Sequence, residues 1–100
     1  MVRNTIESNE QSSQRQLQRM EAIEDWLVKR LATILGIEPD GIDMEEPFVN
    51  YGLGSYQGVQ LAGDLSDWLG FDVPETLVWD YPTIKEVALH LSNEQSAEES

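Results

Sequence analysis

The stretch YGLGSYQ (residues 51–57) joins a loop rich in glycine and proline to an amphipathic helix. Apolar residues recur at helical spacing after this stretch, at Leu61, Leu65, Trp68 and Leu69. Gly70 then closes the pattern, as glycine commonly does just after a helix. Ser55 is therefore expected at or next to the N-cap of the helix, where a small polar residue is favoured.

Before this stretch lies a long segment with many helix-breaking residues. These are Pro39, Gly41, Pro47, Gly52 and Gly54. Four apolar residues are spaced along the same segment: Ile37, Ile42, Phe48 and Leu53. Long loops in compact domains are usually either functional or disordered, and buried anchors argue against disorder. The pattern predicts an ordered functional loop that ends at Ser55.

Three further helices are indicated around this loop and helix. A stripe with steps of three and four predicts a helix that ends near Gly36, and its members are Met20, Ile23, Leu27, Leu31 and Ile34. Residues 77–79 suggest a single turn, and Thr83 with Glu86 forms a capping box that starts the last helix. No run alternates like a strand. We expect an all-α, four-helix bundle with three longer helices, one short third helix and a long first loop.

The two ends of the chain are polar. Residues 1–16 and 93–100 contain mostly Ser, Gln, Asn and Glu, which predicts a flexible N-terminal tail and a flexible, acidic C-terminal tail. One domain, residues 17–92, is expected between them, since 100 residues suffice for only one small core. No apolar run approaches the length of a membrane span, and the start lacks the features of a signal peptide. These observations favour a cytoplasmic, monomeric protein.

Charge and cysteine content limit the possible functions. The net charge is −13, and residues 31–100 account for all of it, with Lys85 as their one basic residue. Such a surface should repel nucleic acid and anionic membranes and attract basic partners, although acidity can also serve solubility alone. The absence of cysteine excludes disulfides, a thiolate nucleophile and Cys-based metal sites, so any thiol chemistry must be imported.

The serine does not match the common catalytic motifs. A nucleophile elbow needs glycine two residues before and after the serine, where this chain has Leu53 and Gln57. The one histidine, His90, lies on the last helix and is expected to be a surface or partly packed residue. The glycines fit no dinucleotide loop and the carboxylates of residues 40–46 fit no calcium loop, so neither nucleotide nor metal is expected. Ser55 therefore suits either modification or a plain N-cap role.

Two separated motifs resemble the phosphopantetheine attachment region of acyl and peptidyl carrier domains. FVNYGLGSY (residues 48–56) is similar to the family signature whose serine is modified, and PETLVWDYPTI (residues 74–84) is similar to the segment around the third helix. The resemblance implies that Ser55 bears a 4′-phosphopantetheine arm, added from coenzyme A by a phosphopantetheinyl transferase. It also implies a non-catalytic carrier that presents acyl thioesters to a loading enzyme, a ketosynthase or other domains of a polyketide or mixed polyketide/peptide synthase. The cargo is expected to be of polyketide type.

The chain departs from the family pattern next to the serine. Gly54 replaces the usual Asp and Tyr56 the usual Leu, so a generic transferase is expected to recognise the site less well. By analogy with the family, the partner-facing residues would be Gly54, Tyr56, Val59, Gly63, Asp64 and Asp67. Val59 and Gly63 could instead serve helix packing. An unmodified, carrier-like docking module therefore remains the alternative.

Overall fold

The computed structural model describes the backbone of residues 2–99 and the side chains of residues 14–93. Within these residues the chain forms helices, turns and loops, without a strand. The four α-helices are α1 (Val2–Leu35), α2 (Ser55–Leu69), α3 (Leu77–Asp80) and α4 (Ile84–Glu99). Two 3₁₀ turns, η1 (Pro39–Gly41) and η2 (Phe48–Tyr51), interrupt the loop between α1 and α2. The expected all-α architecture, with its short third helix, is confirmed.

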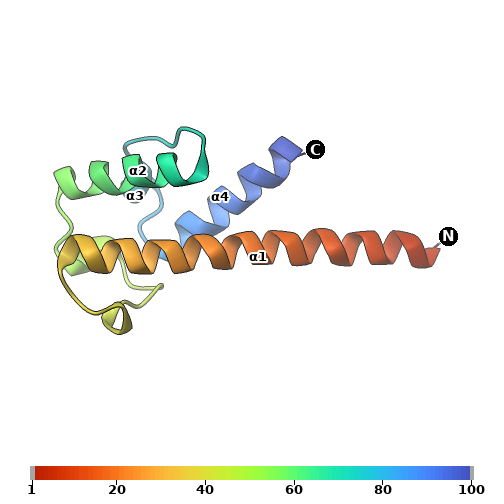
Figure 1. The fold of residues 1–100 in the computed structure, drawn as a ribbon, viewed down its shortest axis with the longest axis horizontal. Helices are drawn as coiled ribbons and strands as arrows, with labels where there is room; N and C mark the ends of the chain where they lie inside the picture. The colour runs from red at the N-terminus through yellow and green to blue at the C-terminus, as the bar shows by residue number, and fades with distance from the viewer. Residues whose placement is uncertain (1, 100) are drawn as a thin grey trace.

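Helix α1 is the longest element; α2 and α4 pack against it, and α3 packs against α2 (Figure 1). Ile23, Leu27 and Leu31 of its apolar stripe belong to one core cluster with residues of α2 and α4. The N-terminal part of α1 extends past α2 (Figure 1). The helix ends where Gly36 adopts a left-handed conformation, with φ of 71°. The Ile37 N–H then donates to the Ala32 carbonyl at 3.0 Å, which satisfies one of the last open acceptors of the helix.

The helix boundaries differ from those expected at both ends of the chain. Composition predicts a tail over residues 1–16, but the backbone is helical from Val2, and α4 likewise continues to Glu99. Residues 2–35 contain neither glycine nor proline, so nothing interrupts the helix even where no apolar stripe requires it. Apolar periodicity marks only the buried part of a helix. The division into a domain of residues 17–92 with two tails stays a prediction.

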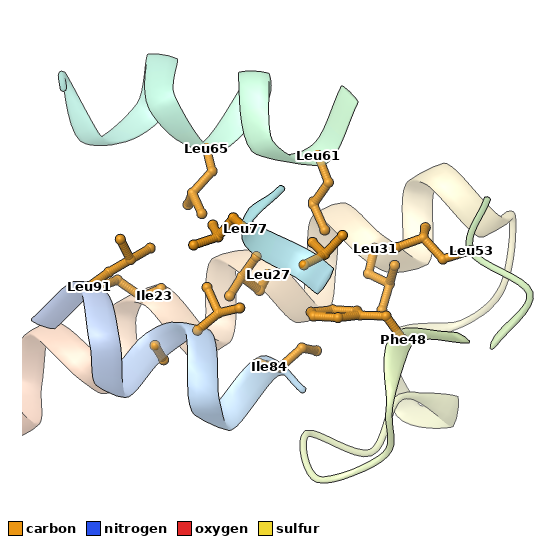
Figure 2. Packing of buried hydrophobic residues seen from close by; sticks show 13 residues of the cluster. Ile23, Leu27, Leu31, Phe48, Leu53, Leu61, Leu65, Leu77, Ile84 and Leu91 are labelled. Atoms are coloured by element: carbon orange, nitrogen blue, oxygen red, sulfur yellow. The ribbon is translucent and has the colours of Figure 1, made fainter. Parts of the chain in front are cut away.

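The core lies between α1, α2 and α4, and the loop before α2 completes it (Figure 2). Leu27 and Leu31 from α1 meet Leu61 and Leu65 from α2, and all four are buried. The remaining helices contribute further buried residues: Leu77, Val78, Ile84, Val87 and Leu91. Burying one such side chain stabilises the fold by about 1.5–3 kcal/mol, so this cluster holds α2 firmly against the rest of the core.

Two of the four expected loop anchors are buried and one is exposed. Phe48 and Leu53 belong to the core, and Ile42 packs partly against it. Ile37, by contrast, is 43% exposed, so its assignment as a buried anchor was wrong. It directly follows the turn at Gly36, where no other element covers it.

Backbone hydrogen bonds tie the loop to the start of α4. The Phe48 N–H donates to the Pro82 carbonyl at 2.8 Å, and the Lys85 N–H donates to the Met44 carbonyl at 3.0 Å. At the same point Thr83 caps α4, because its hydroxyl accepts the Glu86 N–H at 3.1 Å. The loop is therefore held in place by its buried side chains, which pack in the core, and by its backbone hydrogen bonds to the start of α4.

None of the described helices combines the length and the apolar character that crossing a membrane requires.

Candidate functional site

Ser55 is the first residue of α2 and is exposed. Gly54 is the N-cap, with φ of −87° and ψ of 174°. Two hydrogen bonds fix the peptide groups on either side of Gly54. Its N–H donates to the Gln57 side-chain Oε1 at 2.9 Å, and its carbonyl accepts the Gly58 N–H at 2.9 Å. The expected position of Ser55, next to the N-cap, is confirmed.

The segment before the serine is braced from two sides. The side chain of Leu53, only 5% exposed, is inserted into the core immediately before Gly54. Gly52 closes η2 in a left-handed conformation, with φ of 77°, and its N–H donates to the Val49 carbonyl at 3.0 Å. The Tyr51 hydroxyl accepts the Asp43 N–H at 2.6 Å, which links the two halves of the loop. Ser55 is thus exposed on a backbone that is itself well held.

Helix α3 packs closely against the first turns of α2. A Cβ atom placed on Gly58 would lie 2.9 Å from Val78 Cγ2 and 3.3 Å from Trp79 Cζ2. The first of these distances is shorter than real carbon contacts, so only glycine lets α3 approach this closely. Trp79 remains 40% exposed on the surface beside this contact. Trp79 therefore lies at the rim of the core rather than inside it.

The partner-facing residues predicted on α2 form an exposed stripe, with one exception. Tyr56 is 82% exposed and Val59 40% exposed, and Gly63 and Asp67 continue the row at helical spacing. The exposure of Val59 and the open space around Gly63 argue against the packing roles considered for them. Asp64 instead turns toward α1.

Asp64 belongs to a small polar and aromatic cluster between α1 and α2. Its carboxylate lies 3.8 Å from Arg30 Nε, whose guanidinium lies 5.5 Å from the centre of the Trp26 ring. Trp26 in turn stacks on Trp68, with ring centres 5.3 Å apart. Asp67 lines the shallow hollow beside these residues. At 1.5 Å per residue, Asp64 and Asp67 lie about 14 to 18 Å from Ser55 along the helix axis, so they are not part of its immediate surroundings.

Two residues near Ser55 were not assigned a role from the sequence. Gln57 accepts the Gly54 N–H, and Gly58 accommodates α3. A glutamine at the third helical position is half of a capping-box pattern, and this local signal could have identified Gln57. No local signal could have identified the role of Gly58, since it depends on Val78 and Trp79, about twenty residues further along the chain.

The chemistry available around Ser55 is that of an exposed hydroxyl. The first turn of α2 contains no acidic residue. His90 stacks on Tyr81, with ring centres 4.2 Å apart, so the expected partly packed role of this histidine is confirmed. Among the described residues, no group of three or more His, Asp or Glu side chains could hold a metal ion. A hydroxyl at a helix start suits the acceptance of a phosphate ester, because the open N–H groups there favour an anion.

Comparison with known proteins identifies the family. Residues 25–91 match the model of the phosphopantetheine attachment site family. A phenolphthiocerol/phthiocerol polyketide synthase of Mycobacterium tuberculosis is 33% identical over 75 residues. That match covers 75% of this chain but only 4% of the synthase.

Two solved structures are similar over most of their own lengths. A free-standing peptidyl carrier protein from Acinetobacter baumannii is 33% identical, with a TM-score of 0.73 over 76% of this chain and 95% of that protein. Asl1650 from Anabaena, an acyl carrier protein with a variant phosphopantetheinylation-site sequence, is 41% identical, with a TM-score of 0.69 over 75% of this chain and 85% of that protein. The chain therefore belongs to the phosphopantetheine attachment site family and is a carrier domain of the acyl carrier protein type, a class that bears covalent 4′-phosphopantetheine.

Proposed function

We propose that Ser55 is the attachment residue and that the domain delivers acyl groups within a polyketide synthase system. The segment that matches the family, residues 25–91, contains two serines, Ser55 and Ser66. The assignment rests on the difference in exposure between them. Ser66 is partly buried, and its hydroxyl accepts the Val73 N–H at 2.9 Å. Ser55 is exposed at a helix start, so it alone of the two offers an accessible hydroxyl.

The residues around Ser55 fit a phosphodiester. No carboxylate occupies the first turn of α2, so the phosphate would meet no like charge there, and the N-terminal end of the helix favours an anion. The bound group supplies a terminal thiol on a flexible arm, on which an acyl chain is held as a thioester. The protein keeps the Ser55 hydroxyl exposed to solvent on a well-ordered backbone. It also provides the surface around Ser55 that partner proteins bind.

Attachment requires a separate transferase. The Ser55 oxygen forms a bond to the phosphorus next to the pantetheine of coenzyme A, and the pyrophosphate bond breaks. The hydroxyl proton passes to a base, and adenosine 3′,5′-bisphosphate leaves. The variant site of Asl1650 provides a precedent within the fold for a sequence that departs from the usual signature. We infer that Gly54 in place of Asp does not prevent modification.

The partners follow from the surface and from the relatives. The exposed side chains of Tyr56 and Val59 next to Ser55 support docking of the transferase, a loading enzyme or a ketosynthase on the start of α2. The net charge of −13 supports basic partner surfaces and argues against nucleic acid and anionic membranes. We propose that the domain has no catalytic activity of its own and acts as a monomer in the cytoplasm. The alternative, an unmodified docking module, is not favoured by the family match.

The test is modification followed by measurement of intact mass. The purified chain is incubated with coenzyme A, magnesium and a broad-specificity phosphopantetheinyl transferase, beside Ser55→Ala and Ser66→Ala variants. We expect the parent and Ser66→Ala to gain one phosphopantetheine and Ser55→Ala to gain none. A gain that persists in Ser55→Ala would refute the assignment of the residue. An unmodified parent chain would instead favour the docking module.

A further inference from the structure

Gly54 is not required by the backbone or by space. Its φ of −87° is accessible to every residue type. A Cβ atom there would lie 3.7 Å from Gln57 Oε1, which is an ordinary contact distance. Gly54 thus differs from Gly58, where a Cβ would lie 2.9 Å from Val78. A glycine at position 54 therefore removes a capping side chain and adds conformational freedom immediately before Ser55.

Gln57 offsets the second of these effects, the added freedom of the backbone at Gly54. Its Oε1 accepts the Gly54 N–H at 2.9 Å, so the side chain reaches back over the first turn of α2. This bond fixes the peptide group before Gly54, while the bond from the Gly58 N–H to the Gly54 carbonyl, also 2.9 Å, fixes the peptide group after it. Gly58 in turn is held by α3. Of these restraints, the bond to Gln57 is the one that a side chain supplies.

We propose that Gln57 is a positioning residue for the modification of Ser55. It limits the rotation of Gly54 and thereby holds the backbone that carries the Ser55 side chain in one position for transfer of the phosphopantetheinyl group. This inference rests on Ser55 as the proposed attachment residue. Transfer requires the nucleophile to be well oriented at the moment of reaction, so loss of the restraint should slow the chemical step more than it weakens binding.

The test compares Gln57→Leu with Gln57→Glu. Leucine removes the acceptor, whereas glutamate keeps a carboxylate oxygen at the same reach. A single hydrogen bond of this kind corresponds to about a three- to tenfold effect on a rate. We expect Gln57→Leu to lower kcat for modification by that factor with little change in KM. Gln57→Glu adds a negative charge in the first turn of α2, so this variant is compared by exchange of the Gly54 amide hydrogen, which should stay as slow as in the parent. Gln18→Leu, the same exchange on the exposed surface of α1, controls for the loss of a polar surface group.

A double variant distinguishes restraint of Gly54 from direct contact with the transferase. Gly54→Ala restricts the backbone at a site where the extra Cβ fits. If Gln57 acts through Gly54, adding Gly54→Ala to Gln57→Leu should recover much of the lost kcat. Exchange of the Gly54 amide hydrogen, followed by NMR, gives a readout independent of the transferase, and it should be faster in Gln57→Leu than in the parent. Thermal unfolding checks that each variant is folded.

The outcomes separate the two proposals. A parent chain that is modified, with Gln57→Leu modified at the same kcat, would overturn the positioning role alone. A loss of kcat in Gln57→Leu with no recovery in the double variant would also overturn it, because the amide would then contact the transferase directly. A parent chain that is not modified at Ser55 would remove the proposed function and the positioning role together.

Discussion

Replacement of Gly58 by alanine tests the close contact between α2 and α3. Alanine has a higher helix propensity than glycine, which by itself would stabilise α2 by about 0.5–1 kcal/mol. The added Cβ would, however, lie 2.9 Å from Val78 Cγ2, on a side chain that is only 2% exposed and has little room to move. Overpacking of this kind costs about 1–3 kcal/mol. We expect the unfolding free energy of Gly58→Ala to lie between about zero and 2.5 kcal/mol below that of the parent.

Gly63→Ala is the matched control on the same helix. Gly63 is also helical, but a Cβ there meets nothing within 4 Å. This variant should therefore show the propensity gain alone and be more stable than the parent by up to about 1 kcal/mol. Urea unfolding followed by circular dichroism measures both variants, and the slope m should stay constant. The difference between the two variants, about 1–3 kcal/mol, is the steric term. Equal stabilities would refute the argument that α3 requires glycine at position 58.

Three further predictions concern the loop and the start of α4. Phe48→Ala should lower the unfolding free energy by about 3–5 kcal/mol in urea titrations, whereas Val49→Ala, at a side chain 58% exposed, should change it by less than about 0.5 kcal/mol. Thr83→Ala should cost about 0.5–2 kcal/mol and lower the midpoint of thermal unfolding, since it removes the cap of α4, while Thr83→Ser should retain most of the stability. Lys85→Met should cost about 1–3 kcal/mol, because Lys85 Nζ lies 3.7 Å from a carboxylate oxygen of Glu24, a residue only 6% exposed. Adding Glu24→Gln should recover part of that loss; if the double variant is no more stable than Lys85→Met, the ion pair is not the cause.

Short sequence patterns correctly predicted the features that depend only on neighbouring residues. The left-handed glycine after α1, the cap of α4 and the position of Ser55 each depend on residues within one turn of one another. The beginning of α1 could not be placed in this way. Its apolar stripe shows where the helix is buried, and residues 2–16 continue it without one.

The features missed from the sequence depend on which elements meet in space. Ile37 and Leu53 are both apolar residues in the same loop, yet only Leu53 reaches the core, and nothing in their neighbours distinguishes them. The role of Gly58 likewise depends on α3. The candidate attachment residue was predicted because the motifs around it are short and contiguous, whereas the packing that holds it in place involves residues far apart in the sequence.

The hydrogen bonds between the loop and the start of α4 determine how early the segment around Ser55 can fold during synthesis of the chain. Ser55 leaves the ribosome well before Pro82, whose carbonyl holds the Phe48 N–H. Until α4 has emerged, Phe48 lacks this partner and the core lacks Ile84, Val87 and Leu91. A nascent chain that ends before residue 82 would therefore contain the serine without its native support. On the proposed modification of Ser55, a chain whose translation stops before residue 82 should therefore be a poorer substrate for a phosphopantetheinyl transferase than the completed domain.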